Sequence, residues 1–173
     1  IFVVWVRWNT PSQMDDDVFF KKSMDGGVTW SSEVNVSNTA PVDSGRAEIA
    51  VDHNGTIYVV WRGKVMYDPG WKDDIFLSRS TDGGTTWNVG VNISKNQYDS
   101  DHPDIAVDSA GNINVVWNER YQKKVLFSRS VDGGNTWSST VALSNTVFEF
   151  RADPAIAVDI DDNIVPHKNM LAI

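Results

Sequence analysis

The chain has 173 residues and a formal net charge of -8, with 23 aspartates and glutamates against 15 lysines and arginines. This acidic balance argues against nucleic acid or an anionic membrane as the main partner, and no apolar run approaches the length needed to span a bilayer. Because there is no cysteine, disulfides and thiolate metal sites are excluded. The segment DIDDN at 159–163 has oxygen ligands enough for calcium but lacks the glycine of the EF-hand pattern, so we expect an ordinary turn there, no metal and no cofactor.

Short strand-like segments follow one another along the chain and then recur. An apolar run ends at Trp5, and the octapeptide SMDGGVTW occupies residues 23–30. The compact run IAVD at 49–52 precedes IYVVW at 57–61, which is rich in β-branched and aromatic residues, as strands are. The same segments return, with STDGGTTW at 80–87, SVDGGNTW at 130–137, and IAVD at 105–108 and 156–159. Apolar residues do not recur at helical spacing, so one unit is used three times.

Each unit reads as four short strands, labelled A to D in order from IAVD. A four-stranded antiparallel unit of about 50 residues has the size of one β-propeller blade, whereas an immunoglobulin-type sandwich needs about twice that length. The sequence therefore predicts an all-β fold built from propeller blades. Six of the eight tryptophans fall at repeated positions and are expected in the core: Trp5, Trp30, Trp61, Trp87, Trp117 and Trp137.

The octapeptides have the composition of a demanding turn. An Asp-Gly pair between two strands supplies positive φ angles, and the Asp carboxylate can accept backbone N–H bonds within the turn. The pattern Ser-x-Asp-Gly-Gly-x-Thr-Trp resembles the Asp-box, or bacterial neuraminidase repeat, of sialidases and other propellers. This resemblance covers about residues 1–163 and implies a peripheral, structural role for Ser23, Asp25, Gly26, Gly27, Thr29, Trp30, Ser80, Asp82, Gly83, Gly84, Thr86, Trp87, Ser130, Asp132, Gly133, Gly134, Thr136 and Trp137.

The repeat closes at residue 163, so residues 1–163 contain three blades whose last strand A lies at the far end of the chain. Three blades cannot close a ring, since propellers use four to eight. Two alternatives follow. Two chains form a six-bladed homodimer in which the last IAVD of one chain completes the first blade of the other, or the chain is part of a longer propeller. Residues 164–173 meet Pro166 where a central strand would not tolerate it, and we expect an irregular tail outside the repeat.

Function is expected at the rim opposite the octapeptides, where the B-to-C and D-to-A connections meet. Arginines can clamp a carboxylate and exposed aromatic rings offer flat apolar surface for sugars, so an acidic glycan is the expected ligand. The candidate binding residues are Arg7, Trp8, Arg46, Arg62, Trp71, His102, Asp104, Arg120 and Arg151. The alternative is mutual surface pairing of these arginines with carboxylates. The pairs Asp16-Asp17 and Asp73-Asp74 are expected to be solvated strand ends.

Catalysis is a separate question. The resemblance to sialidases implies an arginine triad, an Arg-Ile-Pro segment, an acidic acid/base residue and a tyrosine nucleophile assisted by glutamate. No Arg-Ile-Pro occurs here, and Glu119 and Tyr121 match the last pair only in residue type. Three interpretations stay open: a propeller module that binds glycan or protein, a sialidase-like glycoside hydrolase, and a purely structural module of a larger surface protein.

The sequence also bears on the setting of the protein. The first residue is not Met and no secretion signal is visible, so we expect a mature or excised segment. The family resemblance indicates an extracytoplasmic or secreted location.

Overall fold

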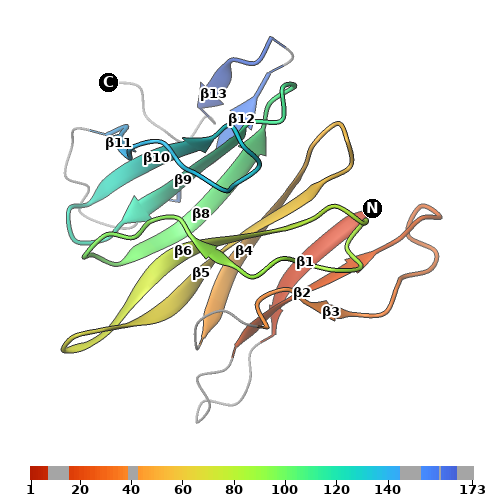
Figure 1. Ribbon diagram of the computed structural model, residues 1–173, viewed down its shortest axis with the longest axis horizontal. Helices are drawn as coiled ribbons and strands as arrows, with labels where there is room; N and C mark the ends of the chain where they lie inside the picture. The colour runs from red at the N-terminus through yellow and green to blue at the C-terminus, as the bar shows by residue number, and fades with distance from the viewer. Residues whose placement is uncertain (8–15, 39–42, 145–152, 160, 167–173) are drawn as a thin grey trace.

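The computed structural model describes residues 1–7, 16–38, 43–144, 153–159 and 161–166. Within them every regular element is a β-strand, so the all-β prediction is confirmed. The strands form four antiparallel sheets (Figure 1). In sheet order they are β1 (Phe2–Arg7), β2 (Asp17–Lys22), β3 (Val34–Asn35); β4 (Ser44–Val51), β5 (Ile57–Tyr67), β6 (Gly70–Ser80), β7 (Val91–Asn92); β8 (Ser100–Val107), β9 (Ile113–Glu119), β10 (Lys124–Ser130), β11 (Val141–Ala142); and β12 (Ile156–Val158), β13 (Ile164–Pro166).

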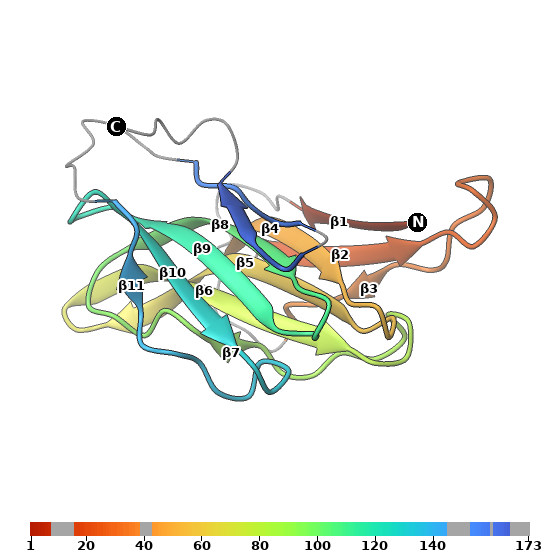
Figure 2. The ribbon, with the colours of Figure 1, turned by 90° about the horizontal axis from the view of Figure 1, so that it is seen from above.

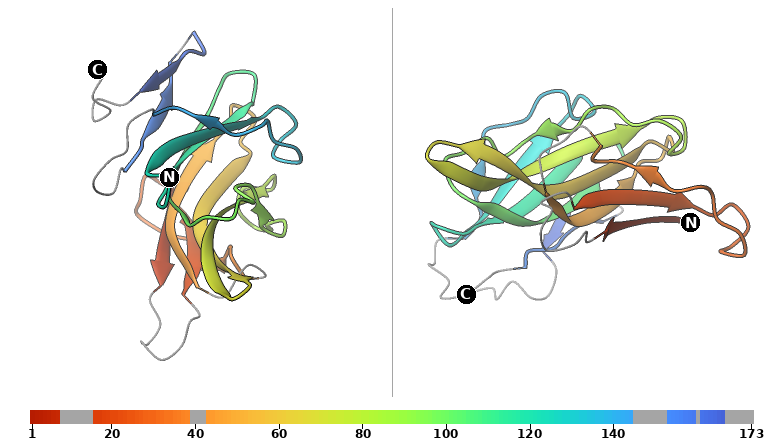
Figure 3. Two further views of the ribbon diagram at one scale, coloured as in Figure 1. Left: turned by 90° about the vertical axis from the view of Figure 1, so that its left-hand side faces the viewer. Right: turned by 90° about the horizontal axis from the view of Figure 1, so that it is seen from below.

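Two of the sheets are complete four-stranded units in the predicted A-B-C-D order. In each of them strand A pairs with strand B, so that Ile49 faces Val59 and Ile105 faces Val115. The strands A of successive sheets lie side by side, β4 against β8 and β8 against β12, as Figures 2 and 3 also show. The blade repeat is therefore present, while the described strands form an arc of sheets.

The core lies between neighbouring sheets. One apolar cluster joins the first sheet to the second and includes Phe20 and Trp61, and another joins the second to the third and includes Leu77 and Trp117. Both tryptophans are fully buried. Polar contacts repeat at the same interfaces, because Lys22 Nζ donates to the carbonyl of Gly83 at 2.6 Å and the guanidinium of Arg79 donates to that of Gly133 at 2.5 Å.

The first sheet has no strand A among the described residues. Ile1, which precedes β1, and Val3 on β1 are 58% and 39% exposed, whereas the residues at the same repeat positions, Ile57 and Val59, are 0% exposed. Trp30 is exposed too, because a box tryptophan packs on the preceding sheet, as Trp87 does edge-on to Phe20 at 5.2 Å. The prediction that Trp30 belongs to the core is therefore wrong for this chain.

Strand β12, the last strand A, pairs with β13 of the same chain rather than with β1. The register joins Ile156 to Pro166 and Val158 to Ile164. Pairing thus continues three residues past the predicted boundary at 163, and Pro166 is accommodated at the end of a short strand. The remainder of the predicted tail, 167–173, lies outside the described residues.

The octapeptide turns bond internally in all three copies. Asp82 accepts bonds from the N–H of Thr86 at 2.9 Å, from the hydroxyl of Thr86 at 2.6 Å and from the hydroxyl of Ser80 at 2.8 Å. The same bonds reach Asp25 and Asp132. These three carboxylates are therefore used within their own turns, which agrees with an architectural role.

The internal bonds make the stability of the protein sensitive to acid. Hydrogen bonds from the threonine side chain hold the pKa of Asp25 and of Asp132 at about 2, against an ordinary value of 3.8, and lower that of Asp82 as well. A carboxyl whose pKa is depressed by folding stabilises the folded state above its unfolded pKa and loses that effect as the pH falls through its folded pKa. We expect a urea midpoint that is steady above pH 5 and declines from about pH 4 to pH 2.

The variant Asp82→Asn should reduce this decline, because the residue no longer takes up a proton. Urea denaturation at a series of pH values measures it. An identical pH profile in the variant and the unaltered protein would contradict the assignment.

Candidate functional site

The antiparallel strand order fixes which connections share a rim. We call the end that holds the β5–β6 and β9–β10 turns and the starts of β4 and β8 the hairpin rim. The octapeptides and the A-to-B turns lie at the opposite end; Figure 1 shows the β5–β6 turn at the lower left and the β4–β5 turn at the upper right. The connections that the sequence analysis placed on one rim thus lie together at one end of the sheets.

Strands β4 and β8 both begin with an irregularity at this rim. The register shifts between Gly45 and Glu48 in one strand and between Asp101 and Asp104 in the other. Within these bulges Arg46 and His102, at equivalent repeat positions, have φ angles of 51° and 53°. Bulges re-aim side chains next to functional sites, and a left-handed backbone at a residue other than glycine is costly. The strained backbone at these two positions therefore determines where the Arg46 and His102 side chains lie.

Three arginines gather around two aspartates between the second and third sheets. The guanidinium of Arg120 lies 3.6 Å from a carboxylate oxygen of Asp73 and 3.0 Å from one of Asp101. Arg62 lies 3.8 Å from Asp73, and Arg46 lies 3.4 Å from Asp101. We call these five residues the arginine cluster. It joins the start of β4, the β5–β6 hairpin, the start of β8 and the β9–β10 turn.

The arginine cluster has acidic neighbours beyond its two aspartates. Asp99 accepts the backbone N–H of Asp73 at 3.0 Å. Burial and the charges of Asp99 and Asp101 raise the pKa of Asp73, although Arg62 and Arg120 oppose this effect. Asp101 is completely buried, while Arg46 and Arg120 remain partly open to solvent. The aspartates thus hold the arginines in place, and the two partly exposed guanidinium groups are the ones that a carboxylate ligand could reach.

A hollow of about 430 Å³ adjoins the arginine cluster. In it His102 Nε2 lies 2.9 Å from Asp153 and Nδ1 lies 3.3 Å from Asp101, so the imidazole spans two carboxylates. Burial and the nearby charge of Asp104 raise the pKa of Glu48. The lining residues are Arg46, Glu48, His102, Pro103, Asp104, Asp153, Pro154 and Ala155.

Two of the five remaining candidate residues have other partners. Arg7 pairs with Glu33 at 2.5 Å and stacks over Phe19 at 3.9 Å on the first sheet. Asp104 accepts the backbone N–H of Ile156 at 2.7 Å and so anchors β12. Trp71 lies near the tip of the β5–β6 hairpin. Trp8 and Arg151 lie outside the described residues.

The sequence interpretation misjudged the aspartate pair Asp73-Asp74 within β6. Asp73 and Asp74 are buried rather than solvated. Asp74 bonds to Lys72 at 2.5 Å and Asn92 at 2.6 Å, while Asp73 belongs to the arginine cluster. Asp16, the residue at the position equivalent to Asp73, is buried too. The signal that could have revealed this is the position of each pair directly before the apolar run of strand C.

The two catalytic candidates, Glu119 and Tyr121, lie in different surroundings. Glu119 is 1% exposed and accepts the backbone N–H of Gln122 at 3.1 Å, which caps the β9–β10 turn. Tyr121 is 78% exposed and stacks on Tyr98 with ring centroids 5.1 Å apart. A nucleophile and its base must lie within hydrogen-bond reach of each other. We therefore assign neither residue a catalytic role.

Repeated antiparallel sheets with octapeptide turns at one rim define the class of Asp-box repeat proteins. The sequence model of one family of this class, the BNR repeat-like domain, matches residues 2–158. The chain belongs to the BNR repeat-like domain family. No curated protein matches it.

Solved structures with a similar fold include sialidases. A Hadza microbial sialidase aligns with 90% of this chain at 18% identity and a TM-score of 0.58, and the match covers 36% of that chain. A mutant NanB sialidase from Streptococcus pneumoniae aligns with 83% at 12% identity and a TM-score of 0.58, over 21% of its own chain. The intramolecular trans-sialidase from Ruminococcus gnavus, in complex with oseltamivir carboxylate, aligns with 77% at 21% identity and a TM-score of 0.54, over 28% of its own chain. The chain thus spans little more than a third, at most, of these proteins.

Proposed function

We propose that this chain is a sialidase-like Asp-box module that binds an acidic glycan through the arginine cluster. The observation that supports this most is the convergence of Arg46, Arg62 and Arg120 from three different segments on one point of the hairpin rim. Buried Asp101 holds two of them in place. Preorganised guanidinium groups bind a carboxylate with little loss of side-chain freedom.

Titration of the protein with 3'-sialyllactose and with lactose tests this proposal. We expect binding of the acidic trisaccharide and none of lactose, with Arg46→Met weakening binding about 10- to 100-fold, the range for loss of a charge-assisted hydrogen bond. Arg7→Met is the matched control, because Arg7 and Arg46 are equally exposed at 44% and only Arg46 belongs to the cluster. Equal losses in both variants, or equal binding of lactose, would contradict the proposal.

A hydrolase and a purely structural module are the competing functions. The similar solved proteins include sialidases and a trans-sialidase, and the hollow beside the cluster holds carboxyl groups that could exchange a proton. Release of the fluorophore from a fluorogenic sialoside would establish hydrolysis. Absence of any signal on a glycan array would favour the structural module.

We further propose that a strand of the Ile-Ala-Val type covers the open edge of β1. In the two complete sheets the strands equivalent to β1 are β5 and β9. They are covered by Ile49–Val51 of β4 and by Ile105–Val107 of β8. This strand comes from a second copy, whose β12 would exchange β13 for β1, or from a longer propeller chain. Light scattering that finds a compact monomer would exclude the homodimer.

We propose an extracytoplasmic or secreted setting, as the family resemblance of the octapeptides implies. No helix in the described part of the chain is long and apolar enough to cross a membrane. Fractionation of the cells that produce the protein tests its location, and recovery from the cytoplasm alone would contradict the proposal.

A further inference from the structure

We propose that the β5–β6 hairpin carries a second sugar-binding surface, formed by Met66 and Trp71, for the uncharged sugars that follow an acidic residue held by the arginine cluster. This inference rests on the proposed function and extends it, because it makes an oligosaccharide, rather than a single acidic sugar, the ligand. We call these two side chains the hairpin surface.

The hairpin is longer than its counterparts. Strands β5 and β6 have 11 residues each, whereas β9 and β10 have 7 and β1 and β2 have 6. The added residues carry it past the end of the other sheets at the hairpin rim (Figure 1). Near the tip, Met66 is 78% exposed and Trp71 is 46% exposed. A monomer gains nothing in stability from large apolar side chains held in water, so this extension favours a binding role.

The strand register places the hairpin surface in line with the arginine cluster. Met66 pairs directly with Trp71, and Lys64 pairs with Asp73, two residues farther from the hairpin turn. Side chains alternate between the faces of a strand, so Arg62, Lys64 and Met66 share one face. The ion pair of Arg62 with Asp73 lies on that same face. Arg62 and Met66 are four positions apart, which corresponds to about 13 Å along the strand and exceeds the width of one sugar ring.

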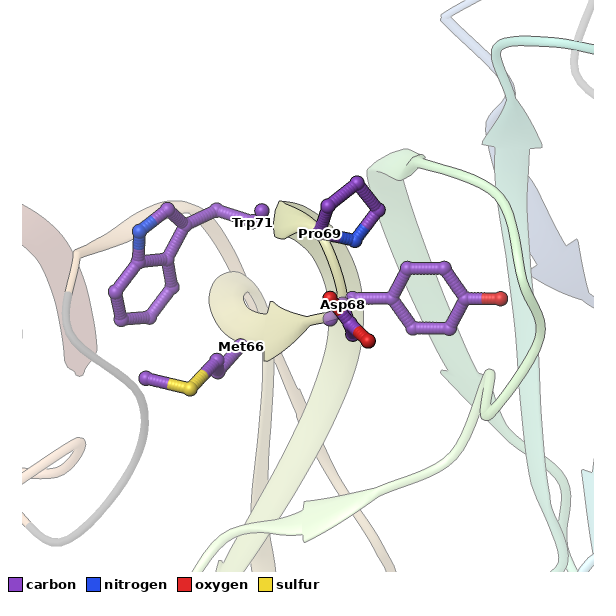
Figure 4. Close-up of a pocket in the computed structure, with 6 residues that line it drawn as sticks. Met66, Asp68, Pro69 and Trp71 are labelled. Carbon is purple, nitrogen blue, oxygen red and sulfur yellow. The ribbon is translucent and has the colours of Figure 1, made fainter.

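The side chains themselves suit a sugar. Figure 4 shows Met66 and Trp71 on the same side of the hairpin, with Asp68 and Pro69 at the turn. An indole offers a flat apolar face, a thioether adapts its shape to a neighbour, and a carboxylate such as that of Asp68 accepts bonds from hydroxyl groups.

The opposite face of the hairpin provides a control. Tyr67 follows Met66 in β5, so its side chain lies on the opposite face of the hairpin. Tyr67 is also partly exposed. Lys72 lies 5.6 Å from the centre of its ring, so this tyrosine already has a partner. Lys64, on the binding face, is tied to Asp43 at 2.9 Å and does not compete with the guanidinium groups for a ligand carboxylate.

The test compares a short acidic ligand with a longer one. Methyl α-sialoside presents the acidic sugar alone, and 3'-sialyllactose adds two neutral sugars. We expect the unaltered protein to bind the trisaccharide about tenfold more tightly, which is the value of one aromatic contact. Trp71→Ala should abolish that preference and leave the affinity for methyl α-sialoside unchanged, whereas Tyr67→Ala should preserve it.

The possible outcomes separate the two proposals. If the unaltered protein binds both ligands equally, or if Trp71→Ala weakens both equally, the hairpin surface is refuted and the arginine cluster stands. If neither ligand binds, the proposed function fails and this inference fails with it. Binding of lactose that depends on Trp71 but not on Arg46 would refute the alignment of the two surfaces.

Discussion

Replacement of Trp61 by alanine is expected to destabilise the folded protein by about 3–5 kcal/mol, the usual cost of deleting a large aromatic side chain from a core. Trp61 is fully buried in β5 and stacks with Phe76 at 5.9 Å. Its cluster joins the first two sheets, so the loss weakens an interface between blades as well as one sheet. Urea denaturation followed by circular dichroism measures the change.

Trp5→Ala is the matched control, because Trp5 occupies the same repeat position on β1 and stacks with Phe19 at 6.0 Å. The open edge of the first sheet leaves Trp5 only partly buried. Less area is removed from water there, so we expect a loss of at most about half as much. Equal losses for the two variants would show that β1 is as well covered as β5 and would contradict the arc of sheets.

Gly84→Ala should also have a large effect. Gly84 has a φ of +85°, and a Cβ at this position would overlap the ring of Phe20 in the preceding sheet. A left-handed backbone costs an alanine about 1–2 kcal/mol, and overpacking adds about 1–3 kcal/mol. We therefore expect about 2–5 kcal/mol of destabilisation in a urea titration.

Gly83→Ala separates these two contributions. Gly83 also has a positive φ, +69°, but a Cβ there would meet only the mobile end of Lys22 at 3.3 Å. Only the backbone cost should remain, about 1–2 kcal/mol. If Gly83→Ala lowered the free energy of unfolding as much as Gly84→Ala does, the close packing of Gly84 on Phe20 of the neighbouring sheet would contribute nothing to stability.

The repeat made the strands and their order predictable. Because IAVD, IYVVW and the octapeptide recur, the antiparallel order A-B-C-D and the division into two rims follow from strand geometry alone. The exposure of Ile1 and Trp30 was not predictable from the repeat, because equivalent sequences become equally buried only when a neighbouring sheet covers them.

The candidate site was predictable in its residue types and not in its geometry. Arginines at the hairpin rim could be named from the sequence, but the bulges that turn Arg46 and His102 into left-handed backbone have no local signature such as glycine. The buried aspartates were missed for a related reason. Pairs of acidic residues usually belong to solvated surface, and only the tertiary approach of Arg62 and Arg120 makes the burial of Asp73 tolerable.

A crystal structure of the protein with bound 3'-sialyllactose tests acidic-glycan recognition most directly. We expect the carboxylate of the ligand within hydrogen-bond distance of Arg46 or Arg120, with the neutral sugars directed toward Trp71. A ligand bound among the octapeptide turns, with its carboxylate remote from all three arginines, would contradict the assignment of the hairpin rim.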